Sequence, residues 1–196
     1  MSTATKIPAR MTVAEFLDWC PEDGQVWQLV DGEPVAMAPA GTTHARIQGE
    51  IAGLLRNHLL ERGDSCAVLV APGVTPHLQR AHNVRIPDLA VTCSSGGDDG
   101  RLLSASVLVI EILSPSNHRE TWANVWAYAS IPDVREILVV SSVEVRADLL
   151  RRGEDGSWPE QPVRITGGEV VLDSIGFRGP LSAFYRTTRL THLPSA

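Results

Sequence analysis

The spacing of apolar residues along the chain predicts three helices. Between residues 43 and 61, apolar side chains recur every three or four positions, and Gly63 follows as a helix stop. A second helix is predicted over 119–130, and a capping box of Thr12 and Glu15 predicts a short helix near the N-terminus. The helix over 43–61 has the pattern of a long core helix.

Runs of alternating or continuous apolar residues predict strands around these helices. The first two predicted strands flank Asp31-Gly32, the strongest short signal for a hairpin. One later run is almost unbroken, as expected of a buried strand. The predicted strands cover residues 25–30, 33–38, 66–74, 84–92, 106–113 (the unbroken run), 134–142 and 145–151, and residues 163–173 are predicted to form a last hairpin.

The order of these elements predicts one layered domain of the α/β (α+β) class, with a mixed central sheet flanked by helices. We find no internal repeat, low-complexity block or domain linker in the sequence. The domain is therefore expected to cover residues 11–190, between a flexible lead over 1–10 and a short tail over 191–196.

Composition places the chain among ordinary globular proteins. It has 196 residues, of which 43% are hydrophobic and 20% are charged. No apolar run approaches the roughly 20 residues needed to cross a bilayer, and no signal peptide is evident, so a cytoplasmic protein without membrane contact is expected. The three cysteines, Cys20, Cys66 and Cys93, are odd in number and widely spaced, which predicts buried or inert thiols rather than a disulfide framework or a zinc site.

The charge of the chain limits both its binding mode and its chemistry. A net charge of −6 argues against a protein that grips nucleic acid over its whole surface, although a local basic groove is compatible with it. The sequence contains 16 arginines but a single lysine, Lys6, which lies in the predicted lead. No lysine of the folded domain is therefore available for catalysis.

Two carboxylates, Asp88 and Glu111, form the most informative pair in the sequence. If strands 84–92 and 106–113 form an antiparallel hairpin centred on Asp99-Gly100, paired residue numbers sum to 199, and Asp88 faces Glu111. Directly opposed residues have Cβ atoms about 5 Å apart, which lets two carboxylates share one divalent cation. This register predicts a metal site.

Each carboxylate also has a structural alternative. Glu111 lies in a buried run, where an ionised carboxylate requires a cation, an arginine or a proton. A salt bridge with an arginine such as Arg85 would satisfy it, and Pro87-Asp88 could mark a strand edge or bulge. The pair taken together favours a metal over either alternative.

The helix predicted over 119–130 begins shortly after Glu111 and carries three polar residues on one face. Glu120, Asn124 and Tyr128 are spaced four residues apart and could face the carboxylates. The alternative, which the residues alone favour, leaves Glu120 and Asn124 in solvent and buries another stripe, formed by Trp122, Val125, Trp126 and Ala129. His44, at the start of the long helix, has the usual expectation of a capping or surface histidine.

Several segments, in this order, make the chain resemble the Uma-two family of restriction-endonuclease-like proteins, a division of the PD-(D/E)xK nuclease superfamily. The likeness covers about residues 11–185 and rests on TVAEFLDW, WQLVDGEPVAMAPAGTTH, RIPDLAVT, LVIEILSPSN and ETWANVWAYASIPDVREILVV. It implies a restriction-endonuclease-like core, with Asp88 as the aspartate of the PD motif and Glu111 as the second acidic ligand. These are the two residues that the strand register brings together.

The sequence departs from the family pattern at three positions. The superfamily lysine two residues after the glutamate is Leu113 here, and a family lysine on the following helix is Asn124. The glutamate that commonly precedes the DG hairpin is Gln28. These changes leave the fold inference intact but weaken the inference of activity.

The resemblance leads to hydrolysis of DNA phosphodiester bonds as the main hypothesis. Mg²⁺ or Mn²⁺ is expected to be held by Asp88, Glu111 and the carbonyl of Ile112, while Asn124 or Gln28 positions the attacking water. Residues expected to support these ligands or to lie near a phosphate are His44, Glu120, Tyr128, Arg85 and Arg119. A homodimer is expected because cutting both strands requires two sites, and no organic cofactor is expected.

Two alternatives remain open from the sequence. The first is a nuclease-fold protein that has lost catalysis together with its lysine and binds nucleic acid or a protein partner. The second is a plain interaction module in which the acidic pair is structural. The second leaves Glu111 in its apolar run unexplained.

Overall fold

The computed structural model describes residues 10–19, 24–94, 100–103, 105–115 and 117–192. The expectations for the N-terminal lead fall almost entirely outside this range, as do those for the end of the C-terminal tail. Lys6, Cys20 and Asp99 also lie outside the described residues.

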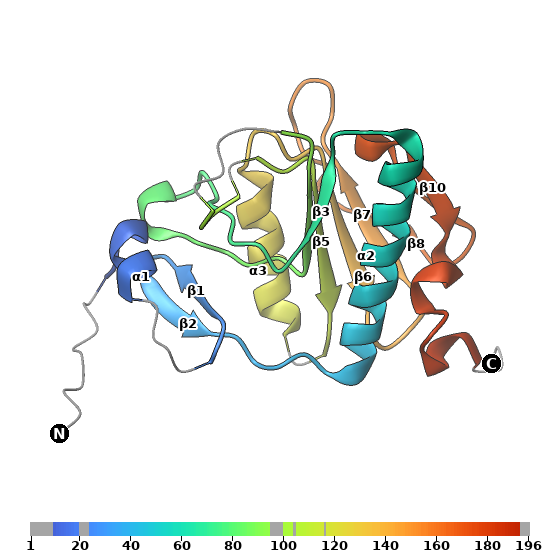
Figure 1. Ribbon diagram of the computed structural model, residues 1–196, viewed down its shortest axis with the longest axis horizontal. Coiled ribbons are helices and arrows are strands. Elements are labelled where there is room, and N and C mark those ends of the chain that lie inside the picture. Colours follow the sequence, from blue (N-terminus) through green and yellow to red (C-terminus); the bar gives the residue numbers. More distant parts are fainter. Residues whose placement is uncertain (1–9, 20–23, 95–99, 104, 116, 193–196) are drawn as a thin grey trace.

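A six-stranded mixed sheet forms the centre of the domain, as the sequence predicts, with the strand order β3-β4-β5-β6-β7-β8 (Figure 1). Only β5 and β6 run parallel, and all other neighbours are antiparallel. The strands are β3 (Ala67–Val70), β4 (Leu89–Thr92), β5 (Leu108–Leu113), β6 (Glu136–Ser141), β7 (Ala147–Arg151) and β8 (Val163–Ile165). The parallel pair is joined by a helix, the connection that parallel strands require.

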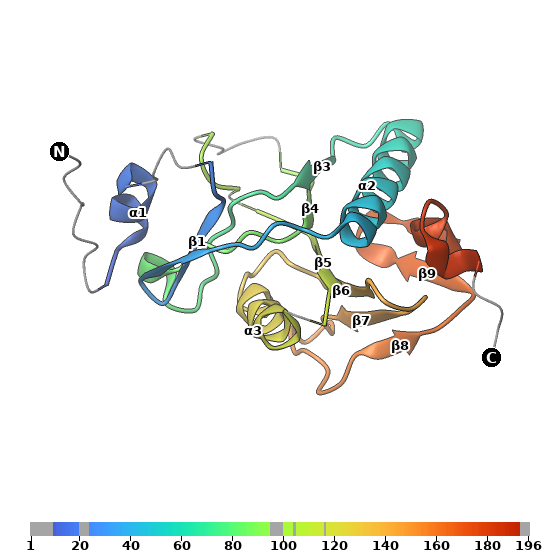
Figure 2. The ribbon, with the colours of Figure 1, turned by 90° about the horizontal axis from the view of Figure 1, so that it is seen from below.

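Two helices cover opposite faces of this sheet, α2 (Thr42–Arg62) on one side and α3 (His118–Ala129) on the other (Figure 2). Their bounds agree within one residue with the helices predicted over 43–61 and 119–130. The predicted stop is confirmed, because Gly63 follows α2 with a φ of 66°, in the left-handed region that glycine adopts without steric cost.

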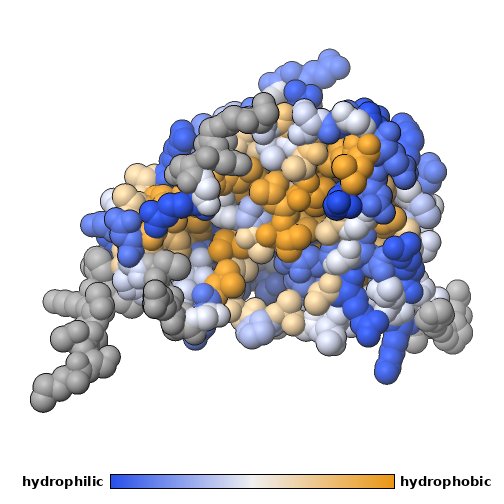
Figure 3. Space-filling view, viewed as in Figure 1, coloured by the Kyte–Doolittle hydropathy of each residue, from blue (hydrophilic) through white to orange (hydrophobic). Residues whose placement is uncertain are grey.

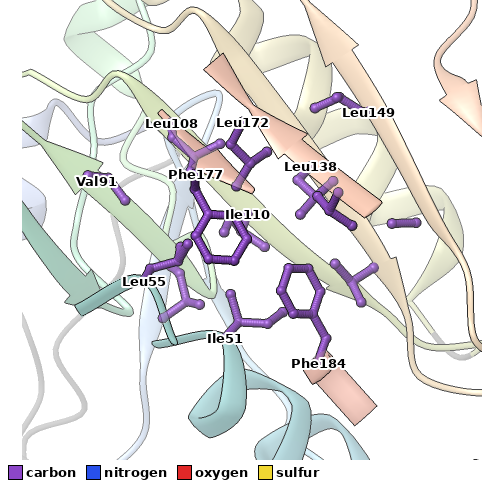
Figure 4. Packing of buried hydrophobic residues seen from close by; sticks show 14 of the residues in the cluster. Ile51, Leu55, Val91, Leu108, Ile110, Leu138, Leu149, Leu172, Phe177 and Phe184 are labelled. Carbon is purple, nitrogen blue, oxygen red and sulfur yellow. The ribbon is translucent and has the colours of Figure 1, made fainter. Parts of the chain in front are cut away.

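The α2 face of the sheet carries the larger apolar core. Ile51 and Leu55 of α2 pack against the central strands, where Ile110 and Leu138 are fully buried. Phe177 and Phe184, from the C-terminal part of the chain, close this core (Figure 4). The α3 face carries a second apolar cluster that includes Val109, Val125, Ile137 and Val139.

The N-terminal part of the chain forms a smaller unit beside the sheet, with α1 (Val13–Trp19), β1 (Trp27–Val30) and β2 (Glu33–Ala36). The predicted capping box is present, since the Thr12 N–H donates to a Glu15 carboxylate oxygen at 2.7 Å and the Glu15 N–H to the Thr12 hydroxyl at 3.3 Å. The predicted hairpin is present too, and both Asp31 and Gly32 at its turn have positive φ angles.

Three strand predictions need correction. The strand predicted over 84–92 begins only at Leu89, because Pro87 cannot donate to a ladder, and the strand predicted over 66–74 ends at Val70, before Ala71 with a φ of 48°. The last hairpin, predicted over 163–173, is wrong. Its two halves join different sheets, since β8 pairs with β7 while β9 (Glu169–Leu172) pairs with β10 (Phe177–Pro180).

Short 3-10 helices complete the fold, at η1 (Arg80–His82), η2 (Asp173–Ile175), η3 (Leu181–Tyr185) and η4 (Arg189–His192).

The space-filling view shows apolar side chains gathered over β3 and the adjoining part of α2 (Figure 3). Leu60 of α2 and Val70 of β3 are among the exposed apolar residues, at 62% and 60% exposure. Within the described residues, no helix has the length and apolar character that crossing a bilayer requires.

The expectation of buried or inert thiols is corrected for Cys66 and Cys93, which form a disulfide. The β3–β4 register pairs Ala67 with Thr92, so one step further along places these two cysteines opposite each other. Their separation of 27 residues in the sequence gives no sign of this proximity, which arises only from the strand pairing.

Candidate active site

The opposed carboxylates are built by the register of β4 and β5. Leu89 pairs with Ile110 and Val91 with Leu108, so the paired numbers sum to 199, as predicted. Asp88 directly precedes β4, and one further step of this register brings it opposite Glu111. The strands are therefore neighbours, and the two carboxylates belong to one site.

Asp88 is held by groups from α2 and β5, and the Ala71 N–H also donates to its carbonyl at 3.1 Å. One carboxylate oxygen lies 2.8 Å from Nε2 of His44, and the other accepts the backbone N–H of Ile112 at 2.6 Å. The side-chain amide of Gln48, one turn after His44 on α2, donates to the Asp88 carbonyl at 2.8 Å. His44 is thus neither a cap nor a surface residue, and its spacing from Gln48 is the signal that could have revealed both.

Glu111 lies on the α3 face of β5 and is almost fully buried. The hydroxyl of Tyr128 donates to its Oε1 at 2.8 Å, and the Asn124 side chain lies near enough to act on the pKa of the carboxyl, which it lowers. Burial raises the pKa of the Glu111 carboxyl well above its usual range, and the negative charge of Asp88 raises it further. The site therefore favours a proton on Glu111 when no cation is present.

The expected alternative of a salt bridge between Glu111 and Arg85 is not found. Arg85 is buried, and its guanidinium donates to Asn124 Oδ1 at 3.1 Å and to Asn83 Oδ1 at 3.0 Å. Among the described residues, Glu111 takes part in no ion pair. No sequence pattern indicated a role for Asn83, because its contacts depend on the segment between η1 and β4.

The helix α3 turns its polar face inward. Asn124 and Tyr128 are buried, whereas Trp126, one of the residues of the alternative stripe, is 47% exposed. The alternative that the residues alone favoured is therefore wrong for Asn124 and Trp126, whereas Glu120 is exposed and Val125 is buried as it expected. Burying Asn124 is tolerated because its Oδ1 accepts a hydrogen bond from Arg85 and its side chain also interacts with the Glu111 carboxyl.

A cavity of about 730 Å³ opens beside the two carboxylates. The segment after β2, the start of α2 and the polar face of α3 form its walls, so three parts of the sequence far from one another meet there. Polar residues that line it are Gln28, Thr42, Thr43, His44, Asp88, Glu111, Ser114, Asn117, Glu120, Thr121, Asn124 and Ser142. A cavity with convergent polar groups and a carboxyl of raised pKa has the character of a functional site.

Gln28 contributes an unusual feature to this cavity. Its side chain is 7% exposed, and its Oε1 is buried with no hydrogen-bond partner. A buried carboxamide oxygen without a hydrogen-bond partner costs free energy. This oxygen atom is therefore suited to coordinate a bound metal ion. Gln28, Asp88 and Glu111 together provide oxygen atoms, the donor type that Mg²⁺ and Mn²⁺ prefer.

The remaining predicted residues lie at different distances from this centre. Glu120 is exposed but lines the cavity, whereas Arg119 is exposed on α3 and is not part of the cavity wall. Ile112 contributes its N–H to Asp88, and its side chain is buried on the α2 face. In the described part of the chain, no cluster of three or more His, Cys, Asp or Glu residues is arranged to hold a metal ion. A metal here would depend on the two carboxylates and on neutral oxygen atoms.

Comparison with known proteins assigns the family. A family model described as "Uma2: Putative restriction endonuclease" matches residues 13–182 of this chain. The chain belongs to the Uma2 family. An uncharacterized protein of Synechocystis is 26% identical over 179 residues, which cover 90% of this chain and 92% of that protein. A crystal structure titled as a putative nuclease belonging to DUF820, from Anabaena variabilis, has a TM-score of 0.72 at 16% identity, with 90% of this chain and 98% of that one covered.

These comparisons support the restriction-endonuclease-like core for this Uma2 protein and confirm the fold class. The structure also explains how this Uma2 chain accommodates one of its departures from the family pattern. Leu113 packs in the apolar cluster on the α3 face and is 6% exposed, so its apolar side chain is accommodated by burial. The other departures, Asn124 and Gln28, both line the cavity.

Proposed function

We propose that this protein is a metal-dependent endonuclease that hydrolyses DNA phosphodiester bonds, with Mg²⁺ or Mn²⁺ held chiefly by Asp88 and Glu111. The observation that carries the proposal is the facing of these carboxylates from adjacent strands, at the wall of a cavity. Membership of the Uma2 family supports the same reaction class. Two carboxylates in contact repel each other, and a shared cation removes that cost.

The ligand set would consist of oxygen atoms. Asp88 and Glu111 each offer a carboxylate, and the Oε1 of Gln28 lacks a partner in the protein. The carbonyl of Ile112 is the fourth ligand in this proposal. A bound divalent cation supplies Lewis-acid activation of the scissile phosphate and lowers the pKa of a bound water.

Residues around the ligands hold them in position. His44 and the Ile112 N–H orient Asp88, while Tyr128 and Asn124 orient Glu111. Asn124 is also placed to position the attacking water, because its amide lines the cavity. In this proposal, Glu120 at the cavity and Arg119 outside it lie near the phosphate groups of the bound DNA.

A cleavage assay tests this function. Plasmid DNA and single-stranded DNA are incubated with the parent protein and Mg²⁺, Mn²⁺ or EDTA, and the same assay is run on the Asp88→Asn and Glu111→Gln variants. The exposed Glu169→Gln on β9 is the matched control. We expect cleavage that requires metal and falls on the order of a thousandfold in both site variants, because the cation contributes several kcal/mol. Cleavage that is equal in all four proteins would disprove the assignment.

A second candidate function is a nuclease-fold protein that binds nucleic acid or a protein partner without cleaving. The observation that favours it is the absence of lysine from the described residues, together with Leu113 and Asn124 at the two family lysine positions. This candidate predicts binding of a labelled DNA duplex in a gel-shift assay, with no cleavage in Mg²⁺ or Mn²⁺. Metal-dependent cleavage by the parent protein would exclude it.

We further propose that the protein acts as a homodimer, because cutting both strands of a duplex requires two sites, and a twofold axis supplies them. Light scattering coupled to size exclusion tests this directly. A mass near twice 21.2 kDa is expected at assay concentration. A monomer that still linearises plasmid DNA would contradict the dimer while leaving the nuclease proposal in place.

A further inference from the structure

Arg85 is a buried cation whose partners are neutral. It is 8% exposed, and backbone hydrogen bonds with Val74 at 2.8 and 2.9 Å fix its position next to the PD segment. In the described part of the chain, its guanidinium forms no ion pair and instead donates to two asparagine side chains. A buried guanidinium without a carboxylate partner is costly, so its retention here requires an explanation.

The orientation of the two asparagine amides follows from the chemistry of the guanidinium. Asn83 donates through Nδ2 to the Asp31 carboxylate at 3.0 Å and to the Leu78 carbonyl at 3.2 Å, so its Oδ1 is the atom that accepts from Arg85. A guanidinium has donors only. Arg85 therefore also requires the Oδ1 of Asn124 to face it.

This requirement determines what Asn124 presents to the site. With Oδ1 turned toward Arg85, the Nδ2 amino group is left to face Glu111, and the Asn124 side chain acts to lower the pKa of that carboxyl, as a nearby donor does. Without Arg85, the amide is free to turn over, and an Oδ1 facing the Glu111 carboxylate would repel it. A chain of contacts thus runs from the Asp31 turn through Asn83, Arg85 and Asn124 to Glu111.

We propose that Arg85 is a positioning residue of the nuclease site, which holds the Asn124 amide so that a fixed N–H donor faces Glu111. This inference rests on the proposed function. It assigns to Arg85 an action through Asn124 rather than a contact with DNA, and it places a positive charge behind the donor in a domain without lysine. Arg85 does not line the cavity itself, so it acts on the site through Asn124, which does.

The test is a double-mutant cycle with Arg85→Met, Asn124→Ala and the combined variant, measured as kcat for plasmid cleavage in Mn²⁺. We expect each single change to lower kcat roughly tenfold, the scale of one hydrogen bond to a charged group. The combined variant is expected to lose no more than the larger single effect, because both changes remove the same contact. Arg85→Lys, which keeps the charge but cannot span both asparagines, is expected to recover only part of the rate.

A second readout does not depend on cleavage. The sequence contains four asparagines, so ¹⁵N-asparagine labelling gives a simple side-chain amide spectrum, in which Asn124→Ala assigns one pair of signals. We expect slow solvent exchange of the Asn124 amide in the parent and at least tenfold faster exchange in Arg85→Met. Thermal melts of each variant establish that it is folded.

The outcomes separate this inference from the nuclease proposal. If the parent cleaves DNA but the losses in Arg85→Met and Asn124→Ala multiply, the inference is overturned and the nuclease function stands. If the parent does not cleave, the nuclease function fails, and the amide exchange alone decides the inference. Exchange at Asn124 that is unchanged in folded Arg85→Met and Arg85→Lys overturns it in either case.

Discussion

The two faces of the central sheet differ in what their helices bury. On the α2 face, the side chains packed against the sheet are apolar, as Ile51, Leu55 and Ile110 illustrate. On the α3 face, the apolar cluster gives way to Glu111 and Asn124, both buried and both hydrogen-bonded. The α2 face therefore stabilises the fold by apolar packing. The α3 face has buried polar residues of the site in place of part of that packing.

This difference shows where chemistry can be placed in a layered domain. A buried carboxylate such as Glu111 destabilises the fold unless a proton, a partner or a ligand compensates it. The α2 face supplies the stability that lets the α3 face carry this cost. Changes in the buried apolar residues of the first face should therefore alter stability alone, and changes at Glu111 or its partners on the second should alter the response to metal.

The largest expected effect lies in the apolar face. Replacing Leu55, which is fully buried, by Ala should lower the free energy of unfolding by about 3 kcal/mol, because it leaves a cavity between α2 and the sheet. Urea denaturation measures this change. Leu60→Ala on the same helix, at a residue 62% exposed, is the control and should change stability by less than about 0.5 kcal/mol. Equal losses in the two variants would contradict the assigned core.

The next effect concerns metal on the α3 face. Mn²⁺ at a hundred times its Kd should stabilise the parent by about 2.7 kcal/mol, because it binds only the folded state. Thermal melts with and without Mn²⁺ measure this response. Asp88→Asn and Glu111→Gln should abolish it, while Leu55→Ala should retain it. A parent protein indifferent to millimolar Mn²⁺ would remove the metal site from the proposal.

The raised pKa of Glu111 predicts a pH dependence in EDTA. Between the pKa of an unfolded glutamate, about 4.3, and the raised value in the fold, the folded state holds a proton that the unfolded state has released. Stability should therefore fall as pH rises through this window, by at most about 1.4 kcal/mol per pH unit. Urea melts from pH 4 to 8 measure this slope, which Glu111→Gln should remove and Glu169→Gln should leave unchanged. An equal slope in Glu111→Gln would show that another group is responsible.

The smallest expected effect is on metal affinity, and it distinguishes the Tyr128 hydroxyl, which contacts Glu111, from a buried tyrosine hydroxyl outside the site. Tyr128→Phe removes the donor to Glu111 and should weaken Mn²⁺ binding about tenfold in calorimetry, the scale for a group that orients a metal ligand. Tyr185→Phe is the matched control, because Tyr185 is also buried but its hydroxyl contacts the backbone of Ser141 and Arg146. This variant should lose stability and keep its metal affinity. Equal weakening in both would refute the assignment of Tyr128.

Much of the fold and the central pair could be predicted from sequence because local patterns determine them. The helical spacing of 43–61, the Asp31-Gly32 turn and the register that pairs Asp88 with Glu111 all follow from short-range signals. The register required only that two neighbouring strands be joined by one loop. Most features that depend on local sequence patterns could therefore be predicted.

The wrong predictions concern contacts between segments that lie far apart in the sequence. Alternation in 163–173 predicted strands but could not show that β8 joins β7 while β9 joins β10. The Cys66–Cys93 disulfide and the burial of Asn124 depend in the same way on tertiary packing. The contact of Arg85 with Asn124 joins residues 39 apart in the sequence, and no periodicity links them.

The attachment of Asp88 to α2 has a consequence for folding. His44 and Gln48, one helical turn apart, hold the side chain and the carbonyl of Asp88. A partly unfolded chain in which α2 has left the sheet would lose both contacts and keep only the N–H groups of Ile112 and Ala71, so Asp88 would be less firmly held while β4 and β5 were still paired. Occupation of the site then reports on the docked helix, and a bound cation should slow the exchange of amide hydrogens along α2, far from the atoms that the ion touches.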